Sequence, residues 1–136
     1  MARDLELFVV ALATVVALDA LWLGVLMRRF YSSRFAAIGR MSGGSMAPIW
    51  PAAALVYVLL AIGIVAFALP HATGSLAQGG VRGALLGGVV YGFYNLTNHA
   101  TLAGWSPAIT VVDITWGIGL CAAVTMVVTL VDGWMR

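Results

Sequence analysis

The sequence contains no lysine, and charged residues of every kind make up only 9% of its 136 positions. A soluble domain usually carries about 25% charged residues, because its surface must stay hydrated. Hydrophobic residues instead make up 62% of the chain, and the mean hydropathy is +1.03. The scarcity of charge excludes a soluble globular protein. It predicts an integral membrane protein with a single transmembrane domain over residues 1–136.

Cysteine and clustered basic residues are also scarce. The single cysteine, Cys121, lies in an apolar run, which excludes an intrachain disulfide and a thiolate metal cluster. The net charge of +2 comes from seven arginines that form neither a basic face nor a basic tail, so no nucleic-acid partner is expected. His71 and His99 fall near opposite membrane surfaces, and no ligand-spaced motif accompanies them. We therefore expect no metal and no cofactor.

Four long apolar segments are present, at about residues 5–27, 48–69, 81–102 and 107–131. A helix that crosses the hydrocarbon core needs roughly 20 apolar residues. Within the bilayer each backbone N–H and C=O must be paired inside its own segment, so each segment is predicted to be a helix. The fold class is therefore all-α, a four-helix transmembrane bundle. The third and fourth segments are joined by only a few residues and should be antiparallel neighbours.

Arginine counting predicts the orientation. The connection between the first and second segments contains no acid and four arginines, Arg28, Arg29, Arg34 and Arg40. The other side has three arginines diluted by three acids, namely Arg3, Arg82, Arg136, Asp4, Glu6 and Asp132. Loops rich in arginine usually stay in the cytoplasm. We expect residues 28–40 to be cytoplasmic and both termini to be outside, in a bacterial inner membrane. The four loop arginines are candidate contacts for lipid headgroups or phosphate.

Polar residues interrupt three of the four segments. A carboxylate at the bilayer centre costs about 2.5–3.5 kcal/mol to insert, and such residues usually face a bundle interior and mark function. At the helical rise, Asp19 lies about 12 Å and Asp113 about 9 Å from the surface that carries the arginine loop. Asn95, Asn98 and His99 of the third segment fall in the same half of the membrane. Three helices thus bring polar groups to one depth.

Helical spacing places these groups on shared faces, because residues three or four apart are neighbours on a helix. We infer an intramembrane pocket of carboxylate, amide, imidazole and aromatic groups, lined by Asp19, Trp22, Tyr91, Tyr94, Asn95, Asn98, His99, Asp113 and Trp116. Asp19-x-x-Trp22 and Asp113-x-x-Trp116 also run in opposite directions, which suits an inverted repeat. The alternative is that the polar groups only hydrogen-bond the helices together.

Small residues spaced four apart, Ala84, Gly88 and Gly92 together with Gly83 and Gly87, give the third segment a small-residue stripe. Such stripes permit close helix contact. They predict either packing inside the bundle or a homodimer through the Ala84/Gly88/Gly92 stripe. Tryptophans at segment ends, Trp50, Trp105 and Trp134, are expected to lie in the aromatic belt at the membrane surface.

Three motifs together resemble a known family. They are Asp19-x-x-Trp22-Leu23-Gly24 followed by Phe30-Tyr31, Tyr91-Gly92-x-Tyr94-Asn95-Leu96-Thr97-Asn98 with Thr101-Leu102-x-Gly104-Trp105, and Val112-Asp113-x-x-Trp116-Gly117. They are similar to the small bacterial predicted membrane proteins classed as domain-of-unknown-function family 2177. The resemblance covers essentially the whole chain. It implies a four-span integral membrane protein and supplies no reaction, substrate or cofactor.

Three functions follow from these patterns and stay open at this point. The first is binding or transport of a small or amphipathic solute in the two-aspartate pocket, coupled to proton exchange by Asp19 and Asp113. The second is a membrane-embedded enzyme that acts on a lipid or isoprenoid substrate, with an aspartate as general acid or base. The third is a non-catalytic subunit or assembly factor of a larger membrane complex.

Overall fold

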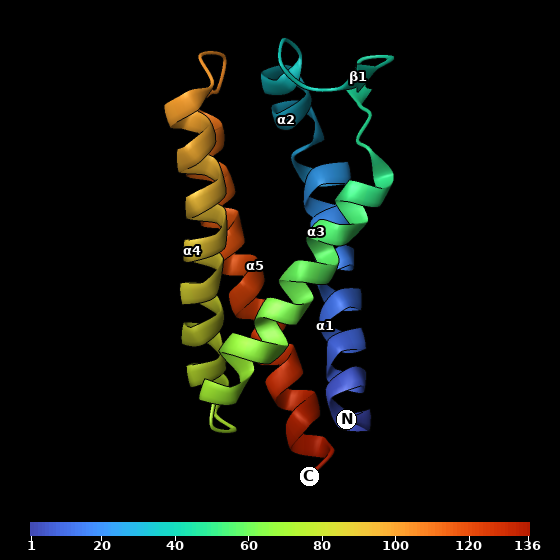
Figure 1. Ribbon diagram of the computed structural model, residues 1–136, viewed down its shortest axis with the longest axis vertical. Helices are drawn as coiled ribbons and strands as arrows, with labels where there is room; N and C mark the ends of the chain where they lie inside the picture. Colours follow the sequence, from blue (N-terminus) through green and yellow to red (C-terminus); the bar gives the residue numbers. More distant parts are fainter.

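The computed structural model describes residues 1–136 and is built mainly of helices. The elements are α1 (Ala2–Leu21) with its continuation η1 (Trp22–Leu26), α2 (Arg28–Phe35), β1 (Met41–Ser42), β2 (Ser45–Met46), α3 (Trp50–Gly63) continued by η2 (Ile64–Ala68) and η3 (Leu69–His71), α4 (Leu76–Thr101) and α5 (Pro107–Trp134). Both termini lie at one end of a bundle of four long helices, and α2 and the β1–β2 hairpin lie at the other end (Figure 1). A long helix lies over each of the four apolar ranges.

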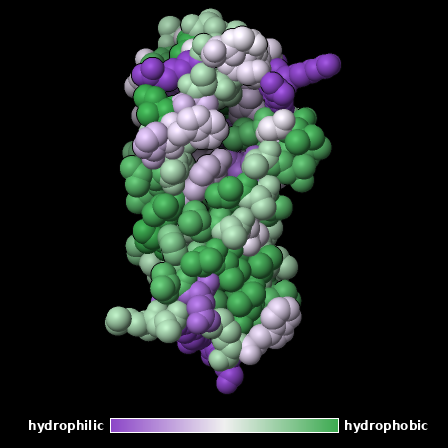
Figure 2. Space-filling view, turned by 90° about the vertical axis from the view of Figure 1, so that its right-hand side faces the viewer, coloured by the Kyte–Doolittle hydropathy of each residue, from purple (hydrophilic) through white to green (hydrophobic).

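Three helical stretches are long and apolar enough to cross a membrane: Ala2–Leu26, Trp50–His71 and Pro107–Trp134. With 26 residues α4 is also long enough, but its glycines and polar side chains lower its hydropathy. The four-span arrangement therefore stays a prediction. On the face drawn in Figure 2, apolar residues cover most of the middle of the molecule, and the most hydrophilic residues lie mainly toward its two ends. This distribution suits a molecule surrounded by lipid.

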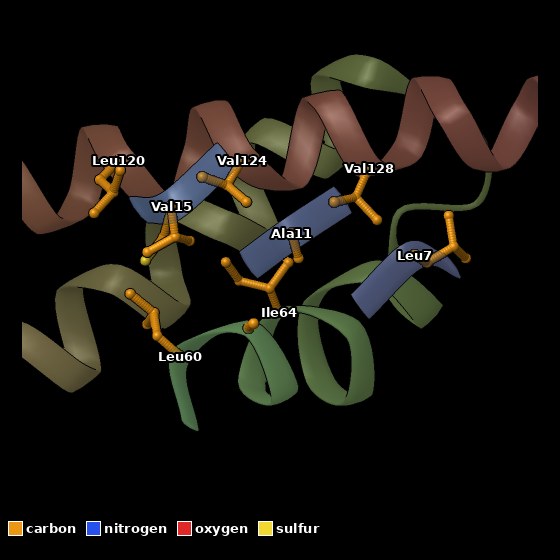
Figure 3. Close-up of a cluster of buried hydrophobic side chains, with 10 residues drawn as sticks. Leu7, Ala11, Val15, Leu60, Ile64, Leu120, Val124 and Val128 are labelled. Atoms are coloured by element: carbon orange, nitrogen blue, oxygen red, sulfur yellow. The ribbon is translucent and has the colours of Figure 1, made fainter. Parts of the chain in front are cut away.

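The hydrophobic core joins α1, α3 with η2, and α5. Its buried side chains repeat every four residues along each helix, as the helical period requires: Leu7, Ala11 and Val15, then Leu60 and Ile64, then Leu120, Val124 and Val128 (Figure 3). Lipid tails are as apolar as these side chains. In a membrane, close packing rather than exclusion from water therefore holds this core together.

The closest helix contact joins α4 and α5, which confirms that they are antiparallel neighbours. Gly79, Gly83 and Gly87 of α4 are buried along this contact. A Cβ atom at Gly83 would overlap the backbone carbonyl of Cys121. The Gly83–Gly87 stripe thus packs inside the bundle. Gly88 also faces α5, since its Cβ would lie 3.6 Å from Ile118; the homodimer stays a prediction.

The course of α3 leaves an opening in the bundle. Within the continuous helical stretch from α3 to η3, α3 packs on α1, whereas the contacts with α4 come mainly from η2 and η3. Figure 1 shows α3 crossing obliquely, with its end near η2 close to α4 and its start over α1. α3 and α4 therefore diverge toward the end of the molecule that carries α2.

The connection between the first two apolar segments is not a simple loop. It contains α2 and a hairpin whose two turn residues, Gly43 and Gly44, have φ of 55° and 76°. Positive φ at both turn positions is the geometry of a type I′ turn, which glycine adopts without strain. Arg28 ties α2 to this hairpin by donating to the Ser45 hydroxyl at 2.8 Å. α2 thereby covers one end of the bundle and buries Tyr31 against Ile109.

Candidate binding site

Asp19 lies near the end of α1 and is only 6% exposed. Its Oδ1 accepts a hydrogen bond from Trp116 Nε1 at 2.8 Å, and its Oδ2 accepts one from the Tyr57 hydroxyl at 2.7 Å. Hydrogen bonds to a charged group are worth about 1.5–3 kcal/mol each. Two neutral donors, from α5 and α3, therefore hold the carboxylate in one orientation.

Asp113 on α5 is held in the same way by two other elements. Its Oδ1 accepts from the Tyr31 hydroxyl at 2.8 Å, and its Oδ2 accepts from Asn95 Nδ2 at 2.6 Å. The same Nδ2 donates to the backbone carbonyl of Tyr91 at 3.0 Å. Because a carbonyl can only accept, this second bond fixes which end of the Asn95 amide faces Asp113. Oδ1 of Asn95 is buried and has no hydrogen-bond partner.

Tyr31 connects Asp113 to the first segment. Its hydroxyl accepts from Trp22 Nε1 at 3.3 Å and donates to Asp113. Burial raises the pKa of Tyr31 above its ordinary value, so the hydroxyl keeps the proton that it donates. A residue of α2, outside the apolar segments, therefore completes the surroundings of an intramembrane carboxylate.

The aspartate of each Asp-x-x-Trp motif is connected by hydrogen bonds to the tryptophan of the other motif. The rings of Trp22 and Trp116 stack with centroids 4.2 Å apart and an angle of 1° between their planes. Asp19 accepts directly from Trp116 of the other motif, and Asp113 is linked to Trp22 through Tyr31. The stacked tryptophans thus join the two carboxylate sites into one network between α1 and α5.

No cationic side chain compensates these carboxylates. Neither Asp19 nor Asp113 forms an ion pair; the ion pairs of the molecule involve Asp4 and Asp132. Neutral donors solvate a carboxylate but leave its net charge in place. The site therefore places two carboxyl groups in one hydrogen-bond network without a basic partner.

Both carboxylates line one cavity of about 490 Å³. Three tyrosines, Tyr57, Tyr91 and Tyr94, share the lining with apolar side chains of η1, α3 and α4. Among the lining residues, Val56 and Leu59 of α3 and Val90 of α4 are exposed on the outer surface. The mouth of the cavity therefore lies between α3 and α4, where these helices diverge, and it is bordered by apolar side chains.

The remaining predicted pocket residues take different places. Trp22, Trp116 and Asn95 bond to the carboxylates or their partners without lining the cavity. Asn98 and His99 do not line it either, and His99 is exposed. Both lie nearer the end of α4 than Tyr94, beyond the cavity.

The loop arginines lie on the exterior. Arg28 and Arg34 are engaged locally, with the guanidinium of Arg34 lying 4.6 Å from the centre of the Phe30 ring. Arg29 and Arg40 are exposed. None of the four reaches the cavity, so their contact with lipid phosphate stays a separate prediction.

The prediction that Trp105 lies in the aromatic belt at the membrane surface is wrong. Trp105 is only 6% exposed and donates from Nε1 to the Thr110 hydroxyl at 3.0 Å. Its ring packs edge-on against Phe35 of α2 and Tyr94 of α4. The short α4–α5 connection folds inward under α2, which removes this tryptophan from the surface.

Sequence reasoning missed Tyr31 and Tyr57 as carboxylate partners. A signal for Tyr57 existed, because it is the only side chain between residues 51 and 69 that can form a hydrogen bond. Tyr31 belongs to the motif that follows Asp19 and Trp22, but its position after the apolar segment, among arginines and serines, did not indicate that it bonds to a carboxylate.

Comparison with known proteins identifies the family. The family model described as Predicted membrane protein (DUF2177) matches residues 5–130, and the chain belongs to this family. No curated protein and no solved structure matches the chain. Together with the three long apolar helices, the family match indicates a multi-pass membrane protein of helical fold.

Proposed function

We propose that this membrane protein binds a small amphipathic solute in the cavity between α3 and α4 and carries it across the membrane. The observation that carries the proposal is the cavity of about 490 Å³ lined by Asp19 and Asp113, neither of which has a cationic partner. This volume lies in the range of about 300–1,000 Å³ that is typical of small-molecule sites. Its apolar mouth and charged interior match an amphipathic ligand.

The alternative that the polar residues only join the helices accounts poorly for two carboxylates. An asparagine at position 19 could accept from Trp116 and donate to Tyr57, which would join the same helices without a buried charge. A carboxylate costs about 2.5–3.5 kcal/mol to insert at the bilayer centre. A charge kept at such a cost, on the wall of a cavity, favours a role in ligand or proton binding.

Proton exchange at Asp19 and Asp113 is part of this proposal. Each carboxylate has neutral donors on both oxygens, so it can lose or gain a proton without breaking an ion pair. A solute that binds in competition with a proton would then be exchanged for it. The expected sign is weaker solute binding as the pH falls, because protonation removes the negative charge that faces the cavity.

We also propose that α4 is a fourth span and that α2 lies in the cytoplasm. α4 runs alongside α5 over a buried glycine contact, and an odd number of spans would separate the two termini, which lie at one end (Figure 1). Impermeant maleimide labelling of intact cells tests this with Ser33→Cys and Ser75→Cys, each in a Cys121→Ser background. We expect labelling at position 75 and protection at position 33. Equal labelling would contradict the topology.

Native mass spectrometry of the protein in a mild detergent tests solute binding. We expect a co-purifying small molecule that is lost in Asp19→Asn and in Asp113→Asn. Glu6→Gln is the matched control, because it removes one negative charge from α1 at an exposed position outside the cavity. Retention of the same molecule, with unchanged pH dependence, in both aspartate variants would overturn the proposal. A bound partner protein without a small ligand would instead support the subunit hypothesis.

A further inference from the structure

The charges of the whole molecule are distributed unevenly around the cavity. Of the acidic residues, Asp132 binds two arginines and Asp4 binds the N-terminal amine. Asp19 and Asp113 line the cavity, and no arginine or histidine lines it with them. The cavity wall thus contains two acids and no base. A ligand with a positive charge would supply the cation that the cavity wall lacks.

Organic and inorganic cations differ in what they need from a site. Ten of the thirteen residues that line the cavity are hydrophobic, whereas hard metal ions prefer six or more oxygen ligands. Nowhere in the molecule do three or more His, Cys, Asp or Glu side chains lie close enough to hold a metal ion. The lining therefore favours a cation that has an apolar body of its own.

Aromatic rings complete the surroundings that such a cation needs. The ring of Tyr91 packs directly on the backbone of Gly117, where a Cβ would overlap it. Tyr94 is half-exposed and is supported from behind by the edge-on ring of Trp105. The faces of aromatic rings attract cations, most strongly where water is excluded. Tyr57 keeps its hydroxyl on Asp19 and adds a third ring to the lining.

Hydrogen-bond capacity points in the same direction. A carboxylate offers about four acceptor positions, and Asp19 and Asp113 each use two of them for neutral donors. The two carboxylates therefore keep unused acceptor positions at the cavity wall. An ammonium or guanidinium group, which only donates, has the complementary chemistry.

We infer that the solute is a lipophilic organic cation, an amine or quaternary ammonium compound with an apolar or aromatic body, which enters the cavity from the lipid between α3 and α4. This inference depends on the proposed function, whose ligand class it specifies. The exposed apolar side chains of Val56, Leu59 and Val90 border the mouth, so an apolar body can pass without desolvating polar groups. The carboxylates then receive the charged group.

Two probes of the same shape and opposite charge test the inference. Equilibrium dialysis of the purified full chain in dodecylmaltoside micelles, with empty micelles as the blank, compares tetraphenylphosphonium with tetraphenylborate. We expect saturable binding of the cation at one per protein and no saturable binding of the anion. In Asp19→Asn and in Asp113→Asn the dissociation constant for the cation should rise by about tenfold or more, since one of two buried charge partners is lost. Glu6→Gln should leave it unchanged.

A second variant guards against misfolding of the aspartate variants. Val90→Trp replaces an exposed apolar residue at the mouth with a larger apolar one and touches neither carboxylate. We expect it to weaken cation binding while thermal unfolding stays as in the wild type. Equal affinity for the two probes, unchanged in the aspartate variants, would overturn the cation inference and leave a binding cavity. Binding of neither probe, with no ligand in the native mass spectra, would overturn the proposed function as well.

Discussion

Asp132 and Asp19 are equally hidden, with 4% and 6% of their surface exposed, yet their surroundings differ in charge. Asp132 lies where the two termini meet, and both its oxygens bind arginines, Arg3 from α1 and Arg136 from the end of the chain. Asp19 lies toward the opposite end of the bundle and binds only the neutral donors Tyr57 and Trp116. The number of hydrogen-bonding partners is the same. The charge of these partners differs.

This difference separates two uses of a buried carboxylate. Around Asp132, two arginines and one acid leave a net positive charge, and the long arginine side chains can reach water at the end of the bundle. That arrangement links α1 to the chain end. Around Asp19 and Asp113 there is no basic side chain, and both residues lie on a cavity wall. At the first site the protein itself neutralises the carboxylate. At the second site only a ligand or a proton can do so.

We expect the largest effect from a substitution that disrupts the packing of α5, the helix that both sites share. α5 carries Asp113 and Asp132, and the glycine contact with α4 holds it in place. Gly83→Ala would drive a Cβ into the backbone of Cys121, which cannot move aside as a side chain could. Overpacking of this kind costs about 3 kcal/mol. We expect a lower thermal unfolding temperature by circular dichroism in detergent. Gly119→Ala, which meets nothing within 4 Å, should be neutral; equal effects would refute the close contact.

We expect the next largest effect from removing the two arginines that bind Asp132, which leaves it, like Asp19, without a cationic partner. Arg3→Gln combined with Arg136→Gln leaves a buried carboxylate without cations. Breaking a fully buried pair costs about 3–5 kcal/mol, but these arginines are half-exposed and partly screened, so we expect about 2 kcal/mol. Adding Asp132→Asn should recover part of the loss, because it removes the unpaired charge. Arg82→Gln, at an exposed arginine without an ion pair, is the control. No recovery by Asp132→Asn would contradict the charge explanation.

Substitutions at Asp19 should distinguish its charge from its hydrogen bonds. Asp19→Asn can keep both partners, since the amide accepts from Trp116 and donates to a rotated Tyr57 hydroxyl; we expect stability within about 0.5 kcal/mol of the wild type. Asp19→Leu leaves two buried donors unpaired, at about 1–3 kcal/mol each, and recovers part of this by removing a buried charge. The expected net loss is about 1–2 kcal/mol. Thermal unfolding checks both values. A larger loss in the asparagine variant would show that the charge itself stabilises the fold.

Much of the helical architecture could be predicted because lipid imposes a simple rule on backbone and side chains. The apolar ranges become helices, and Asp19 and Asp113 turn inward to one cavity because neither can face hydrocarbon. The partners of these aspartates could not be predicted. Tyr31 reaches Asp113 from a helix that follows the first apolar segment, and Arg3 meets Asp132 across 129 positions of the chain. Such pairings depend on helix crossing and on how the connections fold, which residue spacing within one helix does not encode.

The smallest expected effect concerns Tyr31, which lets a helix outside the apolar segments act on Asp113. Tyr31→Phe keeps the ring, stacked 6.4 Å from Phe35, but removes the hydroxyl that joins Trp22 to Asp113. We expect a loss of about 1 kcal/mol. Because burial raises the pKa of Tyr31, this difference from the wild type should be constant between pH 6 and about pH 9. Above about pH 10 the unfolded wild-type chain releases the tyrosine proton and the folded chain does not, so the advantage of the wild type should shrink. Unfolding curves of both proteins across this pH range check the prediction. If the stability difference between the two proteins already declined below pH 9, the Tyr31 hydroxyl would be open to water. Asp113 would then not be shielded by α2 in the way that Asp19 is shielded by α3 and α5.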